Sequence, residues 1–129
     1  RVLFRSDYPG IYINGMEYVE KKNLLIAEVA SGKMKVWEIR ENNKVIQLKE
    51  ISLSGDYPGS FVVFPSCQGL VAASGKPFVN YVEFGKKSYE IQIQTGLKSC
   101  SALLHLPMQG KILVADRDSS DFCLLSYVD

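Results

Sequence analysis

The feature that most constrains the fold is an internal repeat of about 45 residues. Three apolar segments end in Ala27, Ala73 and Ala115, which are 46 and 42 residues apart. Two tetrapeptides also recur unchanged: Asp7–Gly10 returns as Asp56–Gly59, and Ala30–Lys33 returns as Ala73–Lys76. Recurrence at this interval is typical of proteins built from repeated structural units. The repeat therefore predicts several copies of one small unit.

The local pattern predicts strands throughout and almost no helix. No window of eleven or more residues keeps the apolar spacing of an amphipathic helix. Segments such as Val45–Leu53 and Tyr89–Gln94 alternate between apolar and polar residues, which is typical of strands with one face in water. Continuously apolar segments predict strands covered on both faces. Eleven strands are expected, over residues 16–19, 24–29, 34–39, 45–53, 61–64, 70–74, 78–84, 89–94, 102–106, 112–116 and 122–128.

The strands group into three units, at approximately residues 11–55, 56–99 and 100–129. The first two units carry four short strands each, and the last ends after its third. About four strands in each unit of 40–45 residues is typical of a β-propeller blade. The sequence therefore predicts an all-β chain, a β-propeller fragment of about three four-stranded antiparallel blades, the last one incomplete.

Residues 23–39 carry a more specific resemblance. Asn23–Ala27, Ser31–Lys33 and Met34–Ile39 give an apolar strand, a tight polar turn and a strand that ends on Trp37 and Glu38. This order resembles the end of a WD-repeat, although Glu38 stands where the family usually has Asp and no Gly-His pair opens any unit. The resemblance implies a WD-repeat-like propeller that serves as a protein-interaction scaffold, with Trp37 packed between blades.

The first six residues, Arg1–Ser6, resemble the translation of a common sequencing adapter, and the chain begins without Met. We expect this hexapeptide to be non-native and residues 7–129 to form the partial propeller. The alternative is that Val2–Phe4 is a genuine short strand followed by a turn.

The net charge and the cysteine content limit the classes of binding partner and the cellular compartment that we expect. The net charge of +1 is too small for the positive field that attracts nucleic acids or anionic membranes. The apolar runs of about four residues are too short to span a membrane. The three cysteines form no C-x-x-C pair, and no glycosylation sequon occurs. We therefore expect a cytoplasmic or nuclear protein that binds neither nucleic acid nor membrane.

The polar residues do not form a catalytic or metal-binding motif. His105 lies within an apolar run and the chain has no nucleophile-elbow motif, so a partly buried structural role is favoured. The acidic segment Asp116–Asp121 lacks the glycine and terminal glutamate of a calcium loop and is expected to be a solvated hairpin turn. The glycines of Gly69–Lys76 have the wrong spacing for a phosphate-binding loop. No catalytic residue, metal or cofactor is predicted.

The candidate binding residues come from the predicted turns. In the WD-repeat resemblance, the turns between second and third strands and the loops between units lie on one propeller face. The residues brought together there form a candidate binding rim: Asp7, Tyr8, Lys33, Asp56, Tyr57, Lys76 and Arg117. We expect a protein or peptide partner, although the repeated Asp-Tyr-Pro-Gly loops also have a purely structural reading as turns.

Two other functions stay open at this stage. A propeller-fold enzyme could have an active site outside or only partly within this chain. A small up-and-down β-barrel could bind a lipophilic ligand in its interior, but the internal repeat argues against that fold. The propeller interpretation also predicts that three units leave apolar sheet faces open, so that the chain self-associates or packs against missing blades.

Overall fold

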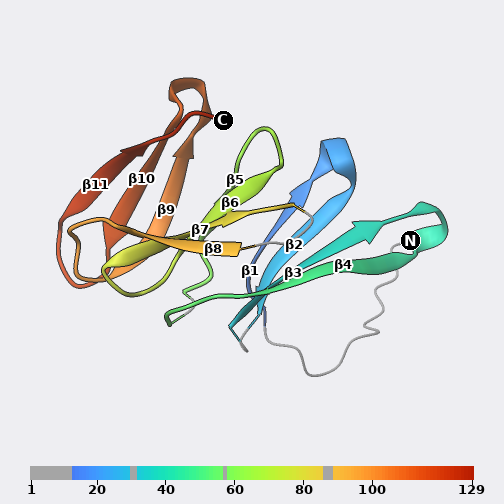
Figure 1. Ribbon diagram of the computed structural model, residues 1–129, viewed down its shortest axis with the longest axis horizontal. Helices are drawn as coiled ribbons and strands as arrows, with labels where there is room; N and C mark the ends of the chain where they lie inside the picture. Colours follow the sequence, from blue (N-terminus) through green and yellow to red (C-terminus); the bar gives the residue numbers. More distant parts are fainter. Residues whose placement is uncertain (1–12, 30–31, 57, 86–88) are drawn as a thin grey trace, which may run out of the picture.

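The computed structural model describes residues 13–29, 32–56, 58–85 and 89–129. The first six residues, together with Asp7 and Tyr8, lie outside these ranges, and so does Tyr57. The chain is all-β and its strands form three antiparallel sheets in sequence order (Figure 1). Among the described residues no helix is long and apolar enough to cross a membrane.

All eleven predicted strands are present, with ends within about three residues of those predicted. The first sheet contains β1 (Ile13–Val19), β2 (Leu24–Val29), β3 (Lys33–Ile39) and β4 (Val45–Ser52). The second contains β5 (Phe61–Val63), β6 (Gly69–Ala73), β7 (Phe78–Glu83) and β8 (Tyr89–Gln94). The third contains β9 (Cys100–Leu106), β10 (Lys111–Asp116) and β11 (Phe122–Ser126).

Short single-turn 3₁₀ helices join some of these strands at one end of the sheets. They are η1 (Glu20–Lys22), η2 (Glu41–Asn43) and η3 (Pro107–Gln109). Asn23 and Gly110 end η1 and η3 in the left-handed conformation, with φ of 52° and 62°, which reverses the chain into the next strand.

In each sheet every strand pairs with the strand that follows it in the chain. Within the described residues the pairing stays inside the three sheets and does not run around a closed ring, so the up-and-down barrel interpretation is wrong.

Two apolar clusters join the sheets face to face. The first places Ile26, Met34, Val36, Ile51 and Leu53 of the first sheet and its following loop against the second sheet. Their partners are Val63, Leu70, Ala72 and Val82. The second cluster places the opposite face of the second sheet, including Val71 and Val79, against Ile112 and Val114 of the third. The second sheet is therefore the middle layer of the described fold.

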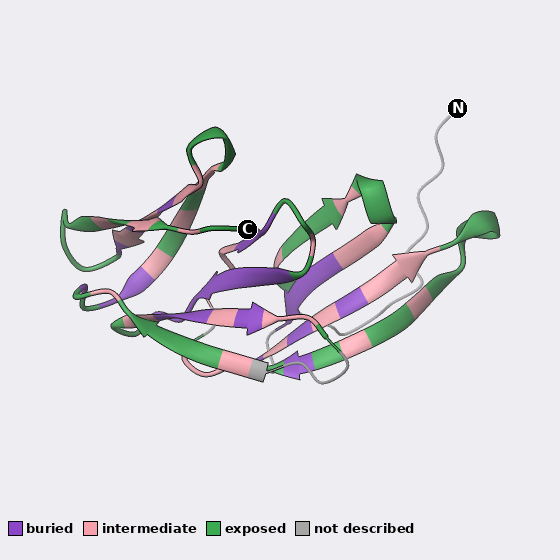
Figure 2. Cartoon of the chain, turned by 45° about the horizontal axis from the view of Figure 1, so that its top comes forward, coloured by how far each residue is buried: buried purple, intermediate pink, exposed green. Residues whose placement is uncertain are grey.

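The burial of the inner strands follows from this layering. Every residue of β6 is buried, as predicted for a strand covered on both faces (Figure 2). In β10, by contrast, Ile112 and Val114 are buried while Leu113 and Ala115 are only half-buried. Coverage of the other face of this segment stays a prediction, because only one face of the third sheet has a described neighbour.

Trp37 also lies on a face without a described neighbouring sheet. Its neighbour Val36 points into the cluster shared with the second sheet, so Trp37 points the opposite way. It is paired across the ladder with Leu25 and is half-buried. Packing of Trp37 against another blade therefore stays a prediction.

Candidate interaction rim

The connections that carry the predicted binding residues lie at one end of the three sheets. In an up-and-down sheet, the turn between its second and third strands and the segment that leaves its fourth strand emerge at the same end. We call these connections the rim; the described rim residues are 32, 53–56, 58–60, 74–77, 95–99 and 117–121, together with Lys33 at the start of β3. The 3₁₀ helices lie at the opposite end (Figure 1).

The Gly-Lys pair of the repeated tetrapeptide occupies equivalent places in the first two sheets. Gly32 precedes β3 and Gly75 lies between β6 and β7, with φ of 80° and 74°. This left-handed conformation is accessible to glycine at little cost, which explains why the turn carries glycine both times. The two copies of the sequence repeat therefore share a left-handed glycine at equivalent places.

Backbone hydrogen bonds join the rim segments to one another. The Asp56 N–H donates to the Ser74 carbonyl at 2.6 Å, which connects the loop before β5 to the turn after β6. The Gly75 N–H donates to the Cys100 carbonyl at 2.7 Å, and the Arg117 N–H donates to that of Ser99 at 3.1 Å. These hydrogen bonds thus connect the turns in a continuous series across the second and third sheets.

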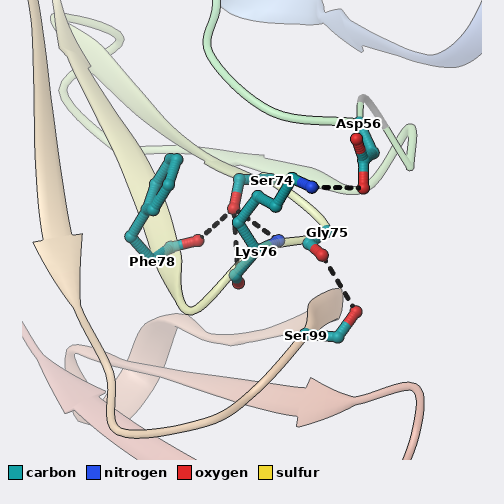
Figure 3. A network of polar contacts seen from close by, with 6 residues as sticks. All are labelled: Asp56, Ser74, Gly75, Lys76, Phe78 and Ser99. Carbon is teal, nitrogen blue, oxygen red and sulfur yellow. Dashed lines mark hydrogen bonds and ion pairs between the residues drawn. The ribbon is translucent and has the colours of Figure 1, made fainter.

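Side-chain hydrogen bonds hold the middle of this series of turns in place (Figure 3). The Ser74 hydroxyl donates to the Phe78 carbonyl at 2.5 Å and accepts from the Lys76 N–H at 3.0 Å, which closes the turn internally. The Ser99 hydroxyl donates to the Gly75 carbonyl at 3.0 Å. Ser74 and Ser99 are both buried, so these bonds form away from water and hold the exposed residues around them in place.

Three of the predicted binding residues converge around Gly75. The Lys76 ammonium lies 3.4 Å from an oxygen of the Asp56 carboxylate, and both side chains are about half exposed. A Cβ at Gly75 would lie 3.0 Å from the Asp56 Cβ and 3.6 Å from Nη2 of Arg117. The structure therefore brings Asp56, Lys76 and Arg117 together on the rim as a small surface of mixed charge.

Lys33 belongs to the same end of the fold but to a different contact. Its ammonium lies 3.4 Å from Oε1 of Glu50, on the neighbouring strand β4. Asp7, Tyr8 and Tyr57 lie outside the described residues.

The acidic turn after β10 is organised by Asp116. Its carboxylate accepts hydrogen bonds from the N–H groups of Asp118 at 2.8 Å and Lys98 at 2.9 Å, which hold its pKa below the usual range. Asp116 is buried, whereas the rest of the segment is exposed. The predicted hairpin turn is present, but its first carboxylate is a buried cap that joins two rim segments.

His105 lies outside the rim, near the opposite end of β9. Its Nε2 lies 2.5 Å from the Tyr127 hydroxyl, and burial lowers the pKa of the imidazole. Among the described residues, no group of three or more His, Cys, Asp or Glu side chains is arranged to hold a metal ion.

Sequence reasoning missed the buried polar residues. Glu28, Asn80 and Ser99 are at most 5% exposed, together with Ser74. Glu28 carried a signal, since a carboxylate inside the apolar run Leu24–Val29 is unusual. The importance of Ser99 arises only from contacts with a turn 24 residues away.

No protein-family model matches the chain, and a search of curated proteins gives no significant match.

Proposed function

We propose that the chain forms part of a WD-repeat-like β-propeller and acts as a non-catalytic scaffold for a protein or peptide partner. The observation that carries the proposal is the stack of three up-and-down sheets in chain order, each packed by its face on the next. Propeller blades are sheets of this kind, arranged around a common axis.

The rim supports a binding role for this scaffold. Its turns are fixed by buried hydrogen bonds, so a partner would meet a surface that is already ordered and would lose little entropy on binding. The exposed groups there include an arginine, a lysine and an aspartate, and charge pairs at such positions give specificity and orientation. The three cysteines are unpaired thiols, which supports a cytoplasmic or nuclear location.

Substitution on the rim tests this function. Removing both rim cations, by Lys76→Ala with Arg117→Ala, should lower the recovery of specific partners on immobilised protein by about tenfold. The matched control is Lys22→Ala with Lys44→Ala, which removes the same charge at the opposite end of the first sheet. Recovery would be measured by quantitative mass spectrometry, with thermal unfolding to verify that both variants fold.

The proposal predicts that one set of captured proteins is lost with the rim variant and kept with the control. If both variants lose the same proteins equally, the capture reflects charge alone and the rim is not the binding surface.

A further inference from the structure

A buried carboxyl group lies at the rim end of the interface between the first two sheets. Glu28 is the penultimate residue of β2 and points to the second sheet, on the same face as Ile26. Its side chain is fully buried, and neither carboxyl oxygen has a hydrogen bond of ordinary geometry within the described residues. The amide oxygen of Asn80 in β7 is buried without a described partner as well. Because a buried charge without partners is costly, this end of the interface favours the neutral form of Glu28.

The segment 58–60, which we call the junction, lies beside this carboxyl. Its backbone is pressed against β1: a Cβ at Gly15 would overlap the Gly59 carbonyl oxygen, and a Cβ at Gly59 would overlap the Asn14 carbonyl oxygen. Gly15 is the ladder partner of Glu28. The Gly59 backbone also lies close enough to the Glu28 carboxyl to lower its pKa, by less than burial raises it. The junction therefore packs on the strand pair that carries Glu28.

The same short segment connects all three sheets. The Ser60 carbonyl accepts a hydrogen bond from the Ala73 N–H of β6 at 2.9 Å, and the Ser60 hydroxyl accepts one from the Leu103 N–H of β9 at 2.9 Å. Earlier in the same loop, the Asp56 N–H donates to the Ser74 carbonyl on the rim. A movement of the junction would therefore change both the contacts between the sheets and the position of the rim loop.

The junction is held more weakly than the sheets on either side of it. Its three residues are only partly buried, and none of them belongs to either apolar cluster. The sheets are held by their ladders and by these clusters. Local opening occurs where apolar contacts are few. A charge on Glu28 is therefore relieved at lower cost by opening of the junction than by separation of the sheets.

The other described charged groups that face this interface have contacts of their own. β5, β6 and β7 direct no acidic or basic side chain to the first sheet. Glu17 in β1 is the ladder partner of Ile26 and shares the face of Glu28, but its carboxyl lies beside the Val63 backbone. The remaining groups are Glu38, Lys49, Glu90 and Asp56, which contact Arg40, Gly85, Ser54 and Lys76, respectively.

We propose that Glu28 is a proton-controlled switch of the junction: the junction is closed while Glu28 is neutral, and it opens to admit water when Glu28 is charged. Opening loosens the rim loop that carries Asp56, and only its effect on partner binding rests on the proposed function. Since burial raises the pKa of Glu28 to about 7, the switch operates between about pH 6 and pH 8.

Native-state hydrogen exchange of the whole chain tests the switch, with each rate divided by the intrinsic rate at the same pH. The Ala73 and Leu103 amides report on the junction because both donate to Ser60. Their opening equilibrium should rise about tenfold from pH 6 to pH 8, since the carboxyl pKa is about 7 when closed and 4.5 when open. A small dependence on denaturant would identify this opening as local.

Amides at the opposite end of the sheets are the internal control. The Ile39 N–H donates to the Asn23 carbonyl, and the Tyr127 N–H donates to the Gly110 carbonyl, both far from the junction in the chain. Their local openings should change less than twofold over the same range of pH.

Two variants identify the titrating group. Glu28→Gln and Glu28→Met both remove the charge at nearly constant length, so each should abolish the pH response of the Ala73 and Leu103 amides. Two replacements of different polarity keep the test informative if one of them fails to fold. The matched control is Glu17→Gln, which removes a carboxyl from the same face and should leave the response unchanged.

Three results would overturn the proposal. The first is a change of less than twofold in the junction openings between pH 6 and pH 8. The second is a pH response that persists when Glu28 is replaced, which would assign the titration to another group. The third is a response found only in openings with the denaturant dependence of global unfolding. None of these measurements uses a partner, so they stand apart from the capture experiment on the rim.

Discussion

At pH 8, replacing Glu28 with glutamine should stabilise the fold by about 3 kcal/mol, whereas at pH 5 the gain should be below about 1 kcal/mol. The reason is that the Glu28 side chain is fully buried between the first two sheets. It projects from β2 on the same face as Ile26, which contacts the second sheet. Neither carboxylate oxygen has a hydrogen bond of ordinary geometry.

The direction of the pH effect follows from the titration of this carboxyl. Burial raises the pKa of Glu28 from 4.5 to about 7, and the backbone of Gly59 lowers it by less. The folded state holds the Glu28 proton more tightly than the unfolded state. Protonation of Glu28 therefore contributes fully to the free energy of unfolding below pH 4.5, and this contribution is lost as the pH rises through 7. Glutamine has nearly the same shape and no charge, so it removes this dependence.

Chemical denaturation at several pH values between 5 and 8 measures the effect. The control is Glu20→Gln, at an exposed position in η1, which should keep the pH dependence of the unchanged chain. The lowered pKa of His105 acts in the opposite direction over this range, but it is common to all three proteins and cancels in the differences. A substitution at Glu28 that changes stability equally at pH 5 and pH 8 would contradict the assignment.

Replacing Ile112 with alanine should destabilise the chain by about 2–5 kcal/mol, because a buried isoleucine leaves a cavity that its surroundings fill only in part. Ile112 is 1% exposed and lies in the cluster that joins the second and third sheets. The matched control is Leu124→Ala, on the opposite face of the third sheet, where the side chain is 49% exposed. We expect the control to cost less than about 1 kcal/mol.

Thermal or denaturant unfolding in dilute solution compares the two variants. The comparison tests the register of the third sheet, since a shift by one residue would exchange its inner and outer faces. A larger loss for Leu124→Ala would show that the sheet packs with its other face, and equal losses would contradict the difference in burial between its two faces.

The strands and their order could be predicted from the sequence because the information is local. Alternation in Tyr89–Gln94 and the apolar run Leu70–Ala73 each determine a strand within a few residues. The repeated Gly-Lys pair likewise marks equivalent positions in two sheets, because its glycine takes a positive φ in both copies. A repeat of local signals was therefore sufficient to divide the chain into sheets.

The candidate site was less predictable because it depends on contacts between distant segments. The approach of Asp56, Lys76 and Arg117 follows from hydrogen bonds between three sequence-distant connections. The coverage of a strand is also non-local: β10 has the same apolar run as β6, but a neighbouring sheet covers only one of its faces. Sequence alone shows which residues could be buried, and the number of neighbours decides which of them are.

In the proposed propeller, the sheets are blades and neighbouring blades cover their outward faces. On the outer face of the third sheet, Leu104 and Phe122 are 57% and 66% exposed, and Met16 on the first sheet is 57% exposed. An apolar blade face of several hundred Å² that stays in water loses roughly 10 kcal/mol of hydrophobic stabilisation, at about 25 cal/mol per Å². This loss is comparable to the stability of a whole domain.

Sedimentation velocity over a range of concentrations tests this claim most directly, with Phe122→Ser combined with Leu124→Ser as the comparison. Residues 7–129 should associate as concentration rises, and the double variant should associate less. A monodisperse monomer at every concentration, with a cooperative thermal transition and no binding of an apolar-surface dye, would contradict it.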